Sequence, residues 1–427
     1  GAHSPYPGGS HATASQSAGC AAVRKEFARA GLIREPGSPG TSTLPYNPLH
    51  PPLTLRSFRK PAARRYPLTD PSRLLAPPLP LPHTTRTSLL LEPPSSTAPQ
   101  LFRDGVCFCT IRATLFDCSR TRQSVRGTAY DIDECNRLWV VDSGRVMMKA
   151  VCPTKILIFD LATDQLIHKY VVPDDQVLYG KAGLVTPIVD VGKTCLDTYL
   201  YVADVDQNGL VIYDLYRDYS WRVNNTRGNA FGPDEDAMNI TIAGEWFDLT
   251  DGTLGMSLSP FGYFNHRYLY FNSLASYYQK YTDTFSLKQS KFREPVIFQS
   301  NYKRASQAGV QATSRRGVIF FQLVQLTAIA CWDIGKPFTP ENVVIIAQDE
   351  ETLQYVSGIK VITNRAGEEE LWFNTNRLQK TINMSLKPTE INFRLIRGKV
   401  DDIIRGTNCE PSGVRTATPD TVFWHQI

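Results

Sequence analysis

The recurring pattern along this chain is a short run of aromatic and β-branched residues that ends in a polar turn. It occurs five times, at residues 137–144, 199–209, 267–273, 317–323 and 370–376. Corresponding points lie about 50 to 70 residues apart, a spacing typical of four-stranded propeller blades rather than of small helical repeats. The pattern therefore predicts an all-β fold, specifically a β-propeller.

The neighbouring segments complete the blades. One repeat has strand patterns at 184–191, 199–205 and 210–215, followed by a tryptophan-bearing strand at 220–223, with polar turns between them. This is an antiparallel meander, and the preceding repeat has the same order. A single blade has an apolar face and two unpaired edges, so several blades must pack together to be stable.

Composition divides the chain. Residues 1–100 contain 18 of the 29 prolines, and residues 1–116 contain 13 Lys and Arg against 5 Asp and Glu. We expect residues 1–116 to be a disordered, basic, proline-rich segment, 117–410 the propeller and 411–427 a C-terminal tail. The propeller region is slightly acidic, so the net charge of +5 does not indicate a nucleic-acid binder. A tail that binds membranes or acidic polymers is a less favoured alternative.

The cysteines suggest three bridges. In a meander, Cys118 and Cys152 share one end of a blade, and we predict that they pair. Cys135 and Cys195 occupy matching turns of neighbouring blades at the other end, which predicts Cys135–Cys195. Cys331 and Cys409 then pair by elimination. Three disulfides indicate an oxidising compartment, whereas reduced core cysteines would indicate a cytosolic propeller.

Other signals of location are mixed. The first residues lack a signal-peptide pattern, and no apolar run reaches membrane-spanning length. Three N-x-S/T sequons stand at Asn224, Asn239 and Asn383, and each is a weak predictor of glycosylation by itself.

Ten long motifs, in order, resemble the Yellow and major royal jelly protein family of insects, from Asp117 to about Glu410. They are found at 131–144, 152–173, 201–215, 220–225, 251–260, 269–276, 327–333, 348–361, 370–380 and 392–409. The resemblance implies a secreted six-bladed propeller. It also implies a role such as pigmentation and melanin synthesis, dopachrome conversion, binding of biogenic amines, or royal-jelly protein.

The chain departs from the family pattern in its N-terminal part. Five blades are recognisable, and the first is missing or scrambled, with only IRATLFDC (111–118) as a remnant. A frameshifted or mis-spliced gene model would explain the proline-rich segment, the extra Cys20, Cys107 and Cys109, and the missing signal peptide together.

The predicted function lies at the rim formed by the turns after the second strand of each blade. These turns carry Asp142, Asp204, Ser273, Gln322 and Asn376. Two carboxylates among amides and hydroxyls suit a cationic amine. The family resemblance adds a small aromatic amine or a catechol- or indole-derived ligand. Nearby aromatic side chains offer stacking surfaces: Phe271, Tyr277, Tyr278 and Trp372. The alternative is that the aspartates only cap turns.

The family resemblance adds ligand-binding positions and a reaction. Matching the family's amine-binding segments residue by residue indicates Ser357, Asn376 and Leu378. For dopachrome conversion, Asp142 or Asp204 is the candidate base, and Arg145 or Arg377 would hold a substrate carboxylate.

Three functions therefore compete. They are conversion or binding of dopamine-derived melanin precursors, non-catalytic amine binding or a structural role, and, more distantly, a calcium-dependent lactonase-like activity. For the first two we expect no metal or cofactor.

Overall fold

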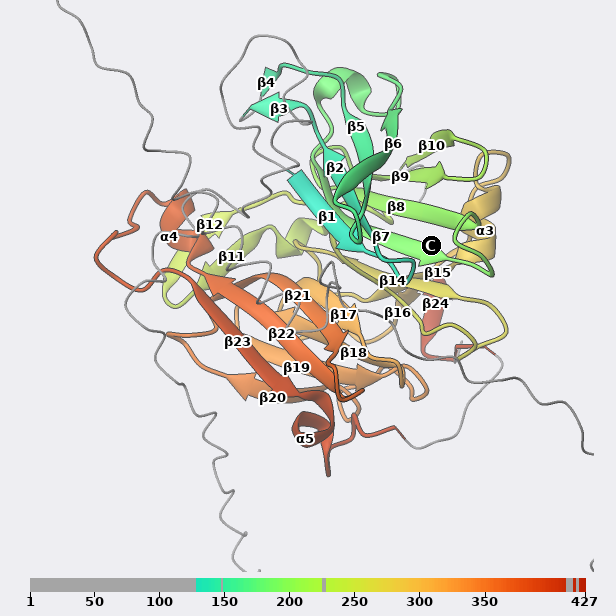
Figure 1. Cartoon of the computed structure of the whole chain (residues 1–427). Helices are drawn as coiled ribbons and strands as arrows, with labels where there is room; N and C mark the ends of the chain where they lie inside the picture. The colour runs from blue at the N-terminus through green and yellow to red at the C-terminus, as the bar shows by residue number, and fades with distance from the viewer. Residues whose placement is uncertain (1–127, 147–148, 225–227, 412–417, 420–421) are drawn as a thin grey trace, which may run out of the picture. The chain divides into compact units, whose positions relative to one another are not determined.

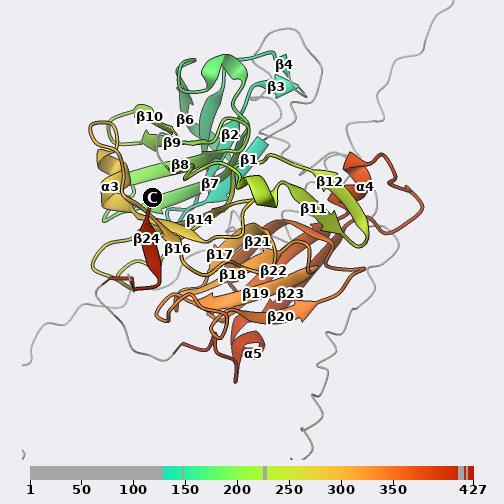
Figure 2. The same ribbon diagram turned by 180° about the vertical axis from the view of Figure 1, so that it is seen from behind.

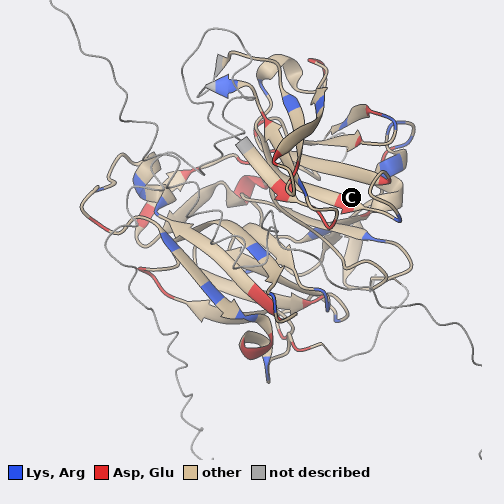
Figure 3. Cartoon of the chain, viewed as in Figure 1, with Lys and Arg blue, Asp and Glu red and all other residues tan. Residues whose placement is uncertain are grey.

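The structure, a computed structural model, describes residues 128–146, 149–224, 228–411, 418–419 and 422–427 (Figure 1). The predicted basic segment 1–116 and the remnant of a first blade lie outside these residues. Lys, Arg, Asp and Glu are interspersed over the blades in the view of Figure 3.

The fold is a β-propeller in which five blades are described, as the five motifs predicted. We number these described blades from 1 to 5 in chain order. Blade 1 is β1 (Thr128–Ile132), β2 (Arg137–Asp142), β5 (Lys155–Asp160) and β6 (Gln165–Val171); blade 2 is β7 (Leu184–Val191), β8 (Thr198–Asp204), β9 (Gly209–Asp214) and β10 (Tyr219–Asn224). Blade 3 is β13 (Thr253–Leu258), β14 (Tyr268–Ser273), β15 (Lys280–Asp283), β16 (Ile297–Ser300) and β24 (Trp424–Gln426). Blade 4 is β17 (Ala308–Thr313), β18 (Val318–Leu323), β19 (Ala328–Asp333) and β20 (Val344–Gln348); blade 5 is β21 (Tyr355–Thr363), β22 (Glu369–Asn376) and β23 (Arg394–Lys399).

Smaller elements lie in the loops within, between and after the blades. They are the hairpins β3 (Arg145–Val146) with β4 (Lys149–Ala150) and β11 (Asn239–Ile242) with β12 (Glu245–Asp248), the helices α3 (Thr284–Gln289), α4 (Leu378–Ile382) and α5 (Val400–Ile404), and the 3-10 turns η2 (Leu178–Gly180) and η3 (Glu235–Ala237). Residues 411–427, which we expected to be a tail, contribute β24 to the edge of blade 3, where Trp424 is buried.

Burial explains why the motifs form second strands. Every residue of β2, β14 and β18 is buried, and each of these strands lies between two partner strands in its sheet. Strands β14 and β18 also have a described blade on both sides, which explains their continuous apolar runs. Strands β6 and β23 alternate exposed and half-buried residues, as outer strands with one solvated face do. The first strands of successive blades contact each other in the order β1, β7, β13, β17, β21.

An amide side chain and a glycine couple consecutive blades. Asn272 on β14 donates its Nδ2 to the carbonyl oxygens of Ala308 (2.7 Å) and Gly309 (3.1 Å) in β17. Gln322 on β18 donates to the Gln354 carbonyl and accepts from the Val356 amide, at 3.1 and 3.0 Å.

The glycines leave room for these amides on the first strands. A Cβ at Gly309 would stand 2.7 Å from Gln322 Oε1, and one at Gly358 would stand 2.5 Å from Asn374 Oδ1. Both distances are shorter than a van der Waals contact, so a larger residue there would displace the amide.

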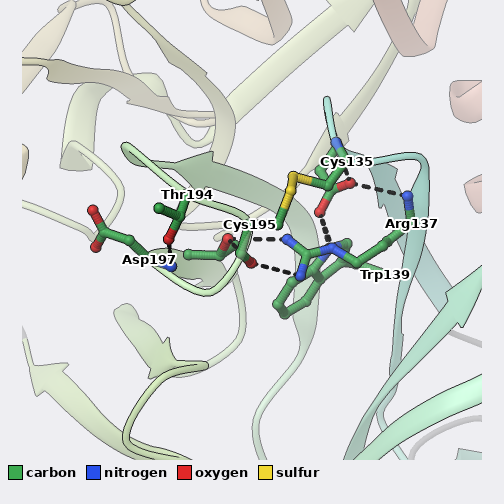
Figure 4. Close-up of a disulfide and its surroundings, with 8 residues drawn as sticks. Cys135, Arg137, Trp139, Thr194, Cys195 and Asp197 are labelled. Carbon is green, nitrogen blue, oxygen red and sulfur yellow. Dashed lines mark hydrogen bonds and ion pairs between the residues drawn. A yellow bond between two sulfur atoms is a disulfide. The ribbon is translucent and has the colours of Figure 1, made fainter.

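Two of the predicted disulfides are present, Cys135–Cys195 and Cys331–Cys409. Cys135–Cys195 joins matching turns of blades 1 and 2 (Figure 4). Arg137 supports the same junction by donating to the Cys195 carbonyl at 2.7 Å and to Asp133 at 2.7 Å. Cys152 is also disulfide-bonded, but its predicted partner Cys118 lies outside the described residues.

Candidate functional site

The second strands of all five blades finish at the same end of the propeller, which we call the rim end. The pairing shows this, because the last residue of each second strand lies opposite the first residue of that blade's first strand, as in Thr128 with Asp142 and Tyr355 with Asn376. The loops that leave β2, β8, β14, β18 and β22 therefore meet there, as the meander predicted.

The β11–β12 hairpin covers the rim end over blades 3 to 5. Its apolar face, with Ile240, Ile242 and Phe247, packs on Leu274, Val324 and Tyr355, which belong to blades 3, 4 and 5 in turn. Figure 2 shows the hairpin beside α4, which it contacts. The rim over blades 1 and 2 is not covered by this hairpin.

A pocket of about 360 Å³, the rim pocket, opens beside the hairpin. It lies between the loops of blades 1 and 2 and the segment that leads from the hairpin into blade 3. Its lining residues are Arg145, Gly180, Lys181, Val205, Asp206, Gln207, Thr250 and Asp251. Its size falls within the range of small-molecule sites.

Arg145 and Asp206 form an ion pair across this pocket. Arg145 Nη1 lies 2.8 Å from Asp206 Oδ2 and also donates to the Ala182 carbonyl at 2.9 Å. Arg145 is buried, whereas the Asp206 side chain is about one-third exposed. Gly183 makes the pair possible, since a Cβ there would come within 2.5 Å of the Asp206 carboxyl carbon.

Asp251 is the titratable group with an unusual pKa in this pocket. Burial, with a smaller contribution from the negative charge of Asp206, raises the pKa of the Asp251 carboxyl to about 6. Asp251 in turn adds to the effect of burial in raising the pKa of Tyr355, so the two groups are near neighbours. A carboxyl that titrates near neutrality is suited to accept or donate a proton.

The loop at the pocket's edge has a strained backbone. Leu178, Tyr179 and Gly180 all have positive φ angles, of 49°, 56° and 79°. Consecutive residues in this region are costly for non-glycine side chains and are found mainly where function or surroundings impose them. The strain marks η2 as part of the candidate site.

The predicted bases Asp142 and Asp204 do not line the rim pocket. Both are fully buried, and each pairs with a cation, Lys155 at 2.9 Å and Arg222 at 2.7 Å. Their second oxygens accept from backbone amides of Gly144 and Gly183. Asp142 accepts from the Gly144 amide and Asp204 from the Gln207 amide, as in the turn-capping alternative, and their role as bases stays a prediction.

The other predicted ligand residues lie elsewhere on the rim. Ser273 and Gln322 are fully buried and bonded to backbone, Ser357 accepts from Asn374, Asn376 ends β22, and Leu378 packs under the hairpin. Arg377 pairs with Glu390. Of the predicted residues, the structure therefore brings only Arg145 into the rim pocket, and the roles of the others stay predictions.

Asp206 and Asp251 were missed because the sequence reasoning stopped at the ends of the second strands. Asp206 lies two residues further into the same turn as Asp204, and Asp251 is two residues before the first strand of blade 3. The usable signal was an acid just outside a strand rather than at its last residue.

The three sequon asparagines are exposed. Within the described residues, no group of three His, Cys, Asp or Glu side chains is arranged to hold a metal ion. No helix among them is long and apolar enough to cross a membrane.

These features define a class, a β-propeller protein with a small polar pocket at its rim end. The family model for major royal jelly protein matches residues 123–409. The chain belongs to this family, which confirms the resemblance drawn from its motifs.

Individual relatives agree. Major royal jelly protein 9 of Apis mellifera is 36% identical over 294 residues, covering 65% of this chain and 67% of that protein. Dopaminechrome tautomerase of Drosophila melanogaster is 30% identical over 330 residues, covering 72% and 67%. Among solved structures, virginiamycin B lyase from Staphylococcus aureus aligns with a TM-score of 0.36 at 10% identity, over 59% of this chain and 64% of that one.

Proposed function

We propose that this chain is a secreted protein that converts a dopamine-derived aminochrome to its dihydroxyindole tautomer in the rim pocket. The observation that carries the proposal is Asp251, a carboxyl with a pKa of about 6 in a pocket of ligand size. The relative named dopaminechrome tautomerase supports the choice of reaction. The disulfides support secretion.

The reaction needs proton transfers and no change in atoms. Two ring C–H protons leave carbon and two quinone oxygens gain a proton, so the quinone becomes a catechol with the same formula. Asp251 in its ionised form removes a ring proton, and its conjugate acid returns one to oxygen. A base with a pKa close to the working pH serves both steps.

The Arg145–Asp206 pair favours a substrate without a carboxylate. Arg145 already has Asp206 at 2.8 Å, so a carboxylated aminochrome would have to displace this acid to reach the guanidinium. Asp206 would also repel the carboxylate. An aminochrome derived from dopamine, which lacks that group, meets neither cost.

The second candidate is amine binding without turnover. Asp206 and ionised Asp251 offer two negative charges to an ammonium group at the same pocket. This candidate predicts binding of dopamine or serotonin and no effect on the lifetime of the aminochrome.

The test combines absorbance and calorimetry on the full chain. Freshly oxidised dopamine should lose its aminochrome absorbance faster with the protein, and Asp251→Asn should abolish the acceleration. Calorimetry with dopamine and serotonin measures binding separately. Binding without acceleration contradicts the enzymatic proposal, and the absence of both contradicts each candidate.

A second variant, Asp206→Asn, tests substrate selectivity. Asp206→Asn frees Arg145 from its acidic partner, so we expect the preference for the dopamine-derived over the carboxylated aminochrome to fall by about tenfold, corresponding to roughly 1.4 kcal/mol. The ratio of kcat/KM values for the two substrates measures it. An unchanged ratio would mean that the Arg145–Asp206 ion pair does not determine which aminochrome is preferred.

A further inference from the structure

A second hollow, of about 570 Å³, lies between the β11–β12 hairpin and α4. We call it the hairpin hollow. Its lining residues are Gly244 to Asp248, Ile382 and Asn383, and none of them lines the rim pocket. The hollow therefore is a separate feature of the same end of the propeller.

Trp246 is the exposed aromatic of this hollow. The hairpin alternates, so that Ile240, Ile242 and Phe247 are buried while Trp246 keeps 61% of its surface exposed. A tryptophan exposed to water leaves a large apolar ring uncovered, and such a ring indicates a binding surface where neighbouring apolar side chains extend it. Ile382 lines the same hollow and is 40% exposed, and Met384, two residues further along the chain, is 90% exposed.

The sequon Asn383-Met384-Ser385 borders the same hollow. The Asn383 Nδ2 donates to the Trp246 carbonyl oxygen at 3.2 Å, so the amide lies against the strand that carries the tryptophan. Glu245 holds the loop in place by accepting from Lys380 at 2.7 Å and from Ser385 at 2.9 Å. Asn383 itself is exposed and follows the last turn of α4, where an attached group has room.

We propose that Asn383 carries an N-linked glycan whose first sugar packs on the Trp246 ring in the hairpin hollow. In the transfer, the sugar C1–oxygen bond to a lipid diphosphate donor breaks, a C1–nitrogen bond forms at Asn383 Nδ2, and the amide loses one proton. The C–H face of a sugar ring complements the negative face of an indole. The glycan would cover the apolar surface that the structure leaves exposed.

Two other sequons provide comparisons. Asn239 lies on the exposed face of the hairpin and donates to Asp248 at 3.3 Å, and Asn224 ends β10 in blade 2. In this proposal only a glycan on Asn383 covers the Trp246 ring. Loss of either other sequon should therefore leave Trp246 as it is.

The test uses the full chain secreted from insect cells behind an added signal peptide. Enzymatic deglycosylation in ¹⁸O water followed by mass spectrometry reports which asparagines are occupied. Hydroxyl-radical footprinting then measures oxidation of Trp246. We expect Asn383 to be occupied and Asn383→Gln to raise Trp246 oxidation roughly threefold, as loss of a stacked partner implies. Asn239→Gln and Asn224→Gln should not change it.

An unoccupied Asn383 overturns the proposal. So does Trp246 oxidation that is insensitive to Asn383→Gln, or that rises with Asn239→Gln instead. If Asn383→Gln is not secreted, enzymatic removal of the glycan from the folded wild-type protein makes the same comparison.

Discussion

At the residue scale, Asp251 combines a stability cost with a chemical use. Its pKa rises from 3.8 to about 6 on folding, so between these pH values the folded protein holds a proton that the unfolded chain releases. Stability therefore falls as the pH rises through this window, and the whole cost is present above about pH 6. The ionised form that costs stability is the form that the proposed reaction requires as its base.

This gives a paired prediction for Asp251→Asn. We expect the variant to be about 1 to 3 kcal/mol more stable than wild type at pH 7, with no difference below pH 3.8, because the neutral amide avoids the buried charge. Aminochrome turnover should fall by about 10² or more. In the wild type, turnover should rise with pH through about 6. Denaturant midpoints and rate profiles measure these effects.

Asp175→Asn is the control, since Asp175 is exposed and outside the rim pocket. A variant of Asp251 that loses turnover and also loses stability at pH 7 would contradict the charge argument, since that result points to damaged packing.

Removing the buried carboxylate of Asp204, which is paired with Arg222, is expected to destabilise the protein, in contrast to the removal of the Asp251 carboxylate. Removing one partner leaves the other charge buried, so Asp204→Asn should cost about 3 to 5 kcal/mol. Denaturant unfolding measures the loss, and the double variant with Arg222→Met should recover part of it. If Asp204→Asn instead kept its stability and lost turnover, the sequence-based prediction of Asp204 as the base would hold.

At the element scale, the sequence predicted most of the blades, and the reason is physical. Second strands such as β14 and β18 are buried on both faces, so their continuous apolar runs stand out in the sequence. Matching turns also placed Cys135 beside Cys195. These features depend on local pattern and on the repeat.

The candidate site was less predictable for an equally physical reason. Asp206 and Asp251 come from loops of different blades, and Asp251 follows a hairpin that no other described blade junction contains. The pKa of Asp251 depends on burial created by those loops together. The sequence of a single segment therefore does not predict the burial of Asp251. The positions of Asp142 and Asp204 at the ends of strands, in contrast, follow from the local sequence pattern, which is why the sequence pointed to them instead.

The Cys135–Cys195 bridge gives a prediction at this scale. It closes a loop of 60 residues, for which chain entropy gives an upper value of about 4 kcal/mol. We expect the Cys135→Ser, Cys195→Ser double variant to lose about 2 to 4 kcal/mol, because the Arg137 contacts to Asp133 and Cys195 hold part of the junction. Thermal unfolding with and without reductant measures it. If the wild type kept its unfolding temperature after the Cys135–Cys195 bridge had been reduced, this expected loss of stability would be contradicted.

At the scale of the whole molecule, two kinds of contact link the blades. Asp131 on β1 and Lys360 on β21 form an ion pair of 2.7 Å between the first and last described blades, with half of the lysine side chain exposed. Exposed pairs contribute little to stability. The buried amide of Gln322 contributes more, because its loss leaves backbone groups of blade 5 without their partner.

We therefore expect Gln322→Ala to destabilise the protein by about 2 to 4 kcal/mol and Lys360→Ala by less than about 1 kcal/mol. Denaturant unfolding of both variants at low and high salt measures the difference. Only the effect of Lys360→Ala should shrink with salt. Equal losses in the two variants would mean that blade coupling does not depend on the amides.

These amides also impose an order on folding. Asn272 and Gln322 both reach forward, to the blade that follows their own in the chain, while Asn374 at the matching place in blade 5 bonds to Ser357 of its own blade. As the chain leaves the ribosome, Asn272 and Gln322 are therefore made before the backbone groups that they bind. Blade 4 reaches its final stability only after the start of blade 5 has been made, whereas blade 3 also needs β24 from the C-terminal end of the chain.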